Sequence, residues 1–132
     1  MDLKEVSCAL LASKAAVDLN AAADTETVLF VVPTGKKAVI HKVVIRSMSA
    51  NATAAVITLG KGGGSCDEFL GNQTLSGLSG TTKAAILQPV PNATPVVQTV
   101  LNTGESFSSE ITTAAGAACT ATFDVFGHLY DE

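Results

Sequence analysis

The sequence is poor in the side chains on which most enzymes and nucleic-acid-binding proteins rely. Charged residues make up 15% of the chain, tryptophan is absent, and there are one tyrosine, five phenylalanines and two histidines. The formal net charge of -4 opposes nucleic-acid binding, because phosphate contacts need a basic surface. The scarcity of aromatic residues also weakens, without removing, a role in carbohydrate binding.

Cysteines and long apolar runs are equally scarce. Cys8, Cys66 and Cys119 are an odd number without close spacing, so the sequence encodes neither a disulfide framework nor a zinc ribbon. No run approaches the roughly 18 apolar residues of a membrane helix. The first residues, MDLKEVSCALLASK, lack the basic start of a secretory signal. We therefore expect reduced thiols and a soluble protein with no membrane partner.

What the chain does contain is a series of strand-like segments. Apolar residues make up 47% of its 132 residues, the length of one ordinary domain. Segments rich in β-branched residues predict strands at residues 27–32, 37–46, 54–59, 84–88, 96–101, 105–111 and 119–130. Their spacing is typical of a two-sheet sandwich. We predict an all-β, antiparallel β-sandwich of jelly-roll or immunoglobulin-like type, formed as a single domain by residues 25–132.

Alternation within two segments indicates which side chains face the core. In residues 119–130, the predicted core face consists of Cys119, Ala121, Phe123, Val125 and Leu129. This long terminal strand is expected to lie centrally in its sheet. In residues 37–46, the better core face consists of Val39, His41, Val43 and Ile45. The glycine-rich residues 60–80 are predicted to form a flexible hairpin tip or long loop.

No set of residues predicts catalysis or metal binding. His41 and His128 lie inside predicted strands among apolar neighbours, where a packed histidine is expected. Cys66, Asp67 and Glu68 combine ligand types, but adjacent residues point apart and no histidine is near. The fold could bring a residue of this cluster towards Glu105 or Asp124 as paired carboxylates, as a small hydrolase would require. We expect no enzyme activity, no catalytic residues, no cofactor and no metal.

The N-terminal residues 1–24 do not show one clear period. They are predicted to form an arm that includes a candidate first strand, with helix as the alternative. The arm carries apolar side chains that we expect to contact a neighbouring subunit. These candidate interface residues are Leu3, Val6, Leu10, Leu11 and Val17.

A long segment without charge also points to self-association. Between Lys83 and Glu105 no residue is charged, and such a stretch is not expected to lie open to water. Burying it between copies predicts a homo-oligomer, with a trimer as the favoured state.

Two similar corners suggest a resemblance to known proteins. Val-Pro-Thr-Gly-Lys at residues 32–36 leads into an apolar strand and then VITLG, and Thr-Gly-Glu-Ser at residues 103–106 leads towards the terminal TATFDVFG. This pattern resembles small virion structural proteins of tailed phages and prophages, over roughly residues 28–127. The resemblance implies a non-enzymatic capsid decoration or cement protein, usually trimeric, that binds the major capsid protein. It also implies a virion location after assembly in the host cytoplasm, with a tail or fibre module that contacts the host, including through sugars, as the alternative.

Overall fold

The computed structural model describes residues 5–90 and 92–132 and is built from eight strands. They are β1 (Glu5–Asp18), β2 (Glu26–Val31), β3 (Lys36–Arg46), β4 (Val56–Lys61), β5 (Leu70–Thr74), β6 (Ala85–Leu87), β7 (Ser106–Thr113) and β8 (Thr120–Asp131). Among the described residues, none belongs to a helix with the length and apolar character needed to cross a membrane.

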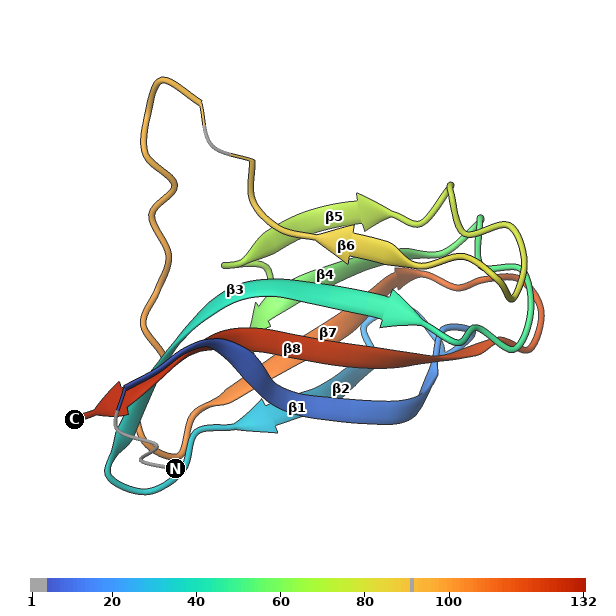
Figure 1. Ribbon diagram of the computed structural model, residues 1–132. Coiled ribbons are helices and arrows are strands. Elements are labelled where there is room, and N and C mark those ends of the chain that lie inside the picture. The colour runs from blue at the N-terminus through green and yellow to red at the C-terminus, as the bar shows by residue number, and fades with distance from the viewer. Residues whose placement is uncertain (1–4, 91) are drawn as a thin grey trace.

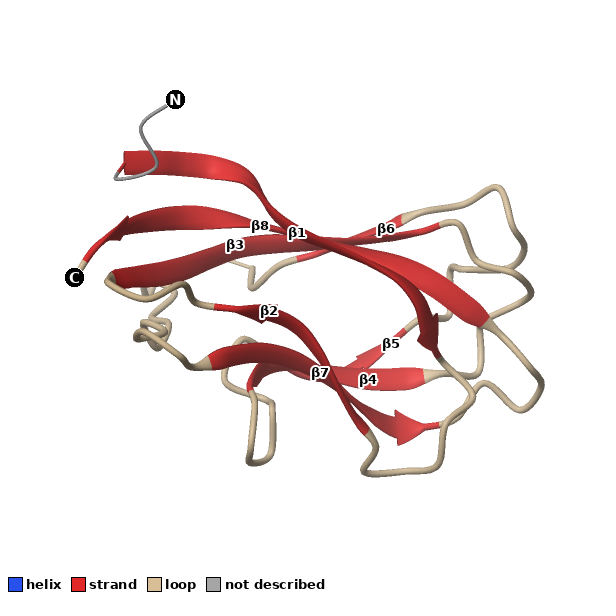
Figure 2. Ribbon diagram, turned by 90° about the horizontal axis from the view of Figure 1, so that it is seen from below, coloured by secondary structure: helices blue, strands red, loops and turns tan. Residues whose placement is uncertain are grey.

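The strands form two four-stranded antiparallel sheets that face each other (Figures 1 and 2). Sheet A has the order β1-β8-β3-β6, and sheet B has the order β2-β7-β4-β5. The predicted antiparallel β-sandwich is therefore confirmed. The expected central position of the last strand is also confirmed, because β8 lies between β1 and β3.

Strand pairing is nested along the sequence. The first strand pairs with the last, β2 with β7, β3 with β6 and β4 with β5. Two further pairings, β3 with β8 and β4 with β7, complete the sheets. Between the sheets lies one apolar core, in which Ile45, Ile57, Leu59 and Phe123 are completely buried. The predicted core face of residues 119–130 is confirmed, because all five of its residues are buried.

A bulge in β3 overturns the predicted core face of that strand. Its buried residues are Ala38, Ile40, Val43 and Ile45. The register with β8 shifts between Ile40 and Lys42, which exchanges the two faces of β3 halfway along. Val39 and His41 therefore lie on the outer side of sheet A, and only the second half of the predicted core face is correct.

Two other predicted segments differ from the structure. Residues 96–101 do not form a strand; Leu101 alone forms an isolated bridge with Ala38. Residues 60–80 contain β5, a short edge strand that the glycine-rich sequence did not indicate. The hairpin within this region is nevertheless present, since β4 pairs with β5.

The N-terminal segment is integrated into sheet A. From Glu5 to Asp18 it pairs with β8, interrupted by three register shifts. A first strand is therefore present, and residues 5–18 pair within their own chain instead of forming a separate arm. Its apolar residues lack a clear period because these shifts, and a positive φ of 57° at Ala16, change the face repeatedly.

The two Thr-Gly corners lie against each other at one end of the sandwich. Gly35 and Gly104 both have a positive φ, 80° and 81°, which explains the need for glycine in each turn. The Thr103 hydroxyl accepts a hydrogen bond from the Gly35 backbone N–H at 3.1 Å and donates one to the Lys36 carbonyl at 2.8 Å. These contacts fix the starts of β3 and β7 relative to each other.

Candidate interaction surfaces

The uncharged segment forms a long loop that stands away from both sheets. Residues 88–90 and 92–100, which follow β6 and precede β7 in the chain, extend from one end of the sandwich (Figure 1, orange). Val90 is 80% exposed and Val97 is 86% exposed. In the single chain these side chains are open to water, so the expected burial of this stretch between copies stays a prediction. Both valines are accessible to another protein.

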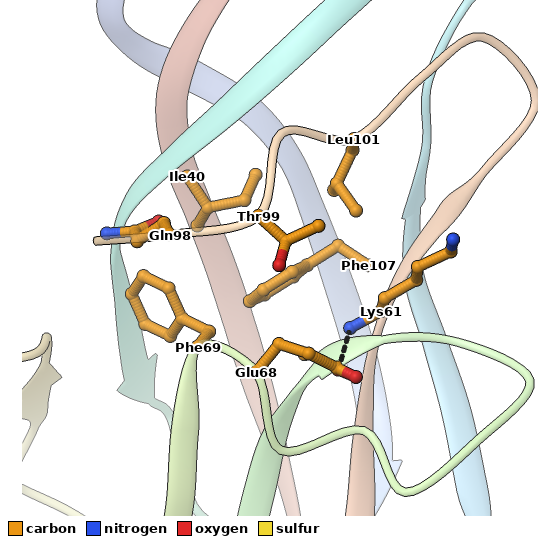
Figure 3. A pocket seen from close by; sticks show the side chains of 9 residues that line it. Ile40, Lys61, Glu68, Phe69, Gln98, Thr99, Leu101 and Phe107 are labelled. Carbon is orange, nitrogen blue, oxygen red and sulfur yellow. Dashed lines mark hydrogen bonds between the residues drawn. The ribbon is translucent and has the colours of Figure 1, made fainter.

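The end of this loop is anchored to the sandwich beside a small cavity. Gln98 and Thr99 line it together with Phe69 and Phe107, as Figure 3 shows. The Ala38–Leu101 bridge closes the segment with two backbone hydrogen bonds of 2.9 Å. The cavity has a volume of about 10 Å³, which is room for roughly one water molecule. The residues that line the cavity pack the base of the loop against the sandwich, and the cavity is too small for a substrate.

A shallow, open hollow lies on the outer face of sheet A. Val39, His41, His128 and Tyr130 line it. The rings of His128 and Tyr130 meet edge to face with centroids 5.6 Å apart, and those of His41 and His128 are 6.5 Å apart. Both histidines therefore contact neighbouring rings on the outside of the sandwich, and His41 does not lie on the core face as predicted. Side chains of this kind can stack against a flat partner.

The rest of this face combines apolar and charged residues. Phe126 is half-buried on the outer face, with the Lys42 ammonium 5.1 Å from its ring centroid. Lys36 forms an ion pair with Asp131 at 2.5 Å, and Arg46 forms one with Asp124 at 2.6 Å. β3 contains four basic residues, Lys36, Lys37, Lys42 and Arg46, and two of them are therefore neutralised by acids from β8.

The predicted interface residues differ in their positions. Leu3 lies outside the described residues, and Val6 pairs with Leu129 in the backbone register. Leu10 is 54% exposed and pairs with Phe126, so it lies on the outer face, whereas Leu11 is half-buried and packs against the core. Val17 is only 3% exposed and belongs to the core. Leu10 thus remains available to a partner, and Val17 does not.

The acidic residues considered for hydrolysis lie in separate or neutralised positions. Glu68 accepts a hydrogen bond from the Lys61 backbone N–H at 2.9 Å, and Glu105 forms an ion pair with the Lys61 ammonium. Lys61 lowers the pKa of Glu105, and Arg46 lowers that of Asp124. A general acid needs a raised pKa, so these carboxyl groups are poorly suited to that role.

Comparisons with known proteins show the fold alone. No family model matches the sequence, and no curated protein matches it. Among solved structures, the chain is similar to a protein chain in the acidic stable capsid structure of Helicobacter pylori bacteriophage KHP30, with a TM-score of 0.54 and 13% sequence identity. The match covers 95% of this chain and 91% of that chain. The whole sandwich, and not one part of it, therefore has a counterpart in a phage capsid structure.

Proposed function

We propose that this protein is a non-enzymatic virion structural protein that decorates and stabilises a phage capsid. The observation that carries the proposal is the match of nearly the whole chain to a chain of a phage capsid structure. The nested strand pairing supports it, because this is the connectivity of the jelly roll, a fold common in capsid proteins.

Exposed apolar surface supports a role in assembly. The loop of residues 88–100 and the outer face of sheet A both present apolar side chains to solvent, including Val97 and Leu10. Self-association as a trimer would cover part of this surface, and contact with the major capsid protein would cover the remainder. We propose Leu3, Val6, Leu10 and Leu11 as contributors to these contacts.

The copy number of the protein in virions tests this function. Particles of the phage or prophage that encodes the chain are purified, and the protein is quantified against the major capsid protein by mass spectrometry. A decoration protein is expected in numbers comparable to the major capsid protein, and heads that lack it should rupture at a lower temperature. Absence from purified virions would refute a structural role.

The hollow on sheet A supports a second candidate function, a tail or fibre module that binds host carbohydrate. His128 and Tyr130 offer two rings, arranged edge to face, at an open surface, and sugar-binding sites use exposed rings of this kind. In that case the protein would be present in a few copies per particle. Binding to a glycan array would be lost on Tyr130→Ala, while a Phe126→Ala control elsewhere on the face would retain it.

A further inference from the structure

The glycine-rich loop between β4 and β5 folds back onto the outer face of sheet B. Its backbone approaches the sheet so closely that a Cβ atom at Gly62 would lie 2.1 Å from Ser106 Oγ and 2.8 Å from Glu26 Oε2. Cys66 in this loop is completely buried. The loop therefore packs against side chains of β2 and β7, whereas the sequence predicts a flexible tip.

Beneath the loop, three potential metal ligands converge from distant parts of the chain. One ligand atom each from Glu26, Cys66 and Glu110 lies within 4.8 Å of the other two. Glu26 also accepts hydrogen bonds from the Gly63 backbone N–H and the Ser108 hydroxyl, both at 3.0 Å, which orient its carboxylate. Burial, together with the Glu26 carboxylate, raises the pKa of the Cys66 thiol to about 12, and the thiol lies 3.4 Å from Glu26 Oε1.

An independent observation marks the same place. The hydroxyl of Thr58 is buried, with the residue 7% exposed, and has no hydrogen-bond partner among the described residues. Thr58 is directly opposite Glu110, which is directly opposite Glu26, so the three form a row across β4, β7 and β2. Opposite residues lie on the same face with Cβ atoms about 4.5–5.5 Å apart. The neighbours of Thr58 in β4, Ile57 and Leu59, face the core. The Thr58 side chain therefore lies on the outer face of sheet B, together with those of Glu26 and Glu110.

We propose that Glu26, Cys66 and Glu110, with Thr58 beside them, form a binding site for Zn²⁺. A thiolate and carboxylates suit this ion, with typical bond lengths of about 2.3 Å to sulfur and about 2.0–2.2 Å to oxygen. Zn²⁺ binding would require the three ligand atoms, which lie within 4.8 Å of one another, to move to these distances from the ion. Cys66 binds as the thiolate, and its proton leaves to solvent. The fourth position belongs to water or to the Thr58 hydroxyl, which then gains the partner it lacks.

The site would fasten the loop to two strands of sheet B. Its ligands come from β2, the β4–β5 loop and β7, and their sequence separation explains why no spacing in the sequence indicated a metal. Occupation would neutralise two adjacent carboxylates while stabilising the fold, because an ion that binds only the folded chain shifts the unfolding equilibrium.

Metal titration of the purified full-length chain tests the proposal. After chelator treatment and dialysis, Zn²⁺ is expected to bind at one equivalent per chain and to raise the thermal unfolding midpoint, whereas Mg²⁺ does neither. Co²⁺ should bind the same site and produce a thiolate-to-metal charge-transfer absorption. Either a lack of stoichiometric Zn²⁺ binding or a Co²⁺ complex without that absorption would overturn the proposal.

Variants identify the ligands. Cys66→Ser and Glu110→Gln should each weaken Zn²⁺ binding at least tenfold, whereas Cys8→Ser, Cys119→Ser and Glu68→Gln should leave it unchanged. Circular dichroism confirms that each variant is folded, and Glu110→Gln provides the decisive measurement if Cys66→Ser does not fold. Unchanged affinity in folded Cys66→Ser or Glu110→Gln, or loss of binding in Cys8→Ser, would place the metal elsewhere.

Discussion

Asp124 shows how one side chain can connect three strands. It projects from β8 on the outer face of sheet A, accepts a hydrogen bond from Ser13 of β1 at 2.6 Å, and pairs with Arg46 of β3 at 2.6 Å. The Arg46 guanidinium lowers the pKa of this carboxyl group; partial burial opposes the effect, and the Ser13 hydroxyl adds to it. The ionised form of Asp124 is therefore favoured by folding.

Replacing this carboxylate should destabilise the sandwich in a pH-dependent way. Asp124→Asn is expected to lower the free energy of unfolding at pH 7 by about 1–3 kcal/mol, as for hydrogen bonds to a charged group. Because the folded pKa is lowered, the contribution of Asp124 is present above the unfolded value of about 3.9 and is lost as pH falls through the folded pKa. Urea unfolding at several pH values should show the difference between wild type and variant shrinking in acid. Asp67→Asn, at an exposed position, is the control, and an equal loss in both variants would contradict the role of Asp124.

Gly127 is the second residue whose environment allows a sharp prediction. A Cβ atom there would lie 2.4 Å from the Val39 carbonyl oxygen and 3.2 Å from Ile40 Cα, beside the bulge in β3. Since backbone cannot move away as a side chain can, Gly127→Ala should cost about 1–3 kcal/mol by overpacking. Gly71→Ala in β5, where a Cβ would meet nothing within 4 Å, should stay within about 0.5 kcal/mol of wild type. Thermal unfolding would disprove the idea if the two variants were equally stable.

At the scale of elements, local alternation predicted some strands and not others. β8 could be predicted because its alternation matches its burial along the whole core face, from Ala121 to Leu129. The position of β3 in the sequence could be predicted, but not which of its side chains face the core. The bulge at Ile40 depends on pairing with β8 and has no signal in the local sequence. The short edge strand β5, LGNQT, is mostly polar and carries no alternation to find. The cluster around Cys66 was missed for a related reason, since only long-range pairing brings its members together.

The first strand provides a prediction that separates core from surface. Val17→Ala removes methyl groups from a position that is 3% exposed and should lower stability by about 1–3 kcal/mol. Leu10→Ala changes a side chain that is 54% exposed and should alter the stability of the single chain by less than about 0.5 kcal/mol. If Leu10 lies in an interface, the same variant raises the protein concentration at which half of the chains are assembled, measured by light scattering. A large loss of stability in dilute Leu10→Ala, with assembly unchanged, would argue against that interface.

For the whole molecule, charge and apolar surface are distributed unevenly. Ion pairs such as Lys36–Asp131 and Arg46–Asp124 lie on the sandwich itself, whereas residues 84–104 contain no charge and include the protruding loop. Nested pairing joins the ends of the chain and holds the sheets rigid, while the loop extends beyond them. A rigid body with one uncharged projection is suited to inserting that projection into a neighbour. The loop is therefore the feature on which assembly should depend most.

Removing apolar surface from this loop should separate assembly from stability. The double variant Val90→Ser, Val97→Ser alters side chains that are 80% and 86% exposed, so the single chain should keep its stability within about 0.5 kcal/mol. Light scattering is expected to give about 40 kDa for the wild type, three times the 13.4 kDa chain, and a mass shifted towards 13.4 kDa for the variant at the same concentration. Val31→Ser is the matched control, because it replaces a valine that is 54% exposed on β2, away from the loop. A monomeric wild type would contradict the trimer. A variant that remains trimeric would contradict the dependence of trimer formation on Val90 and Val97.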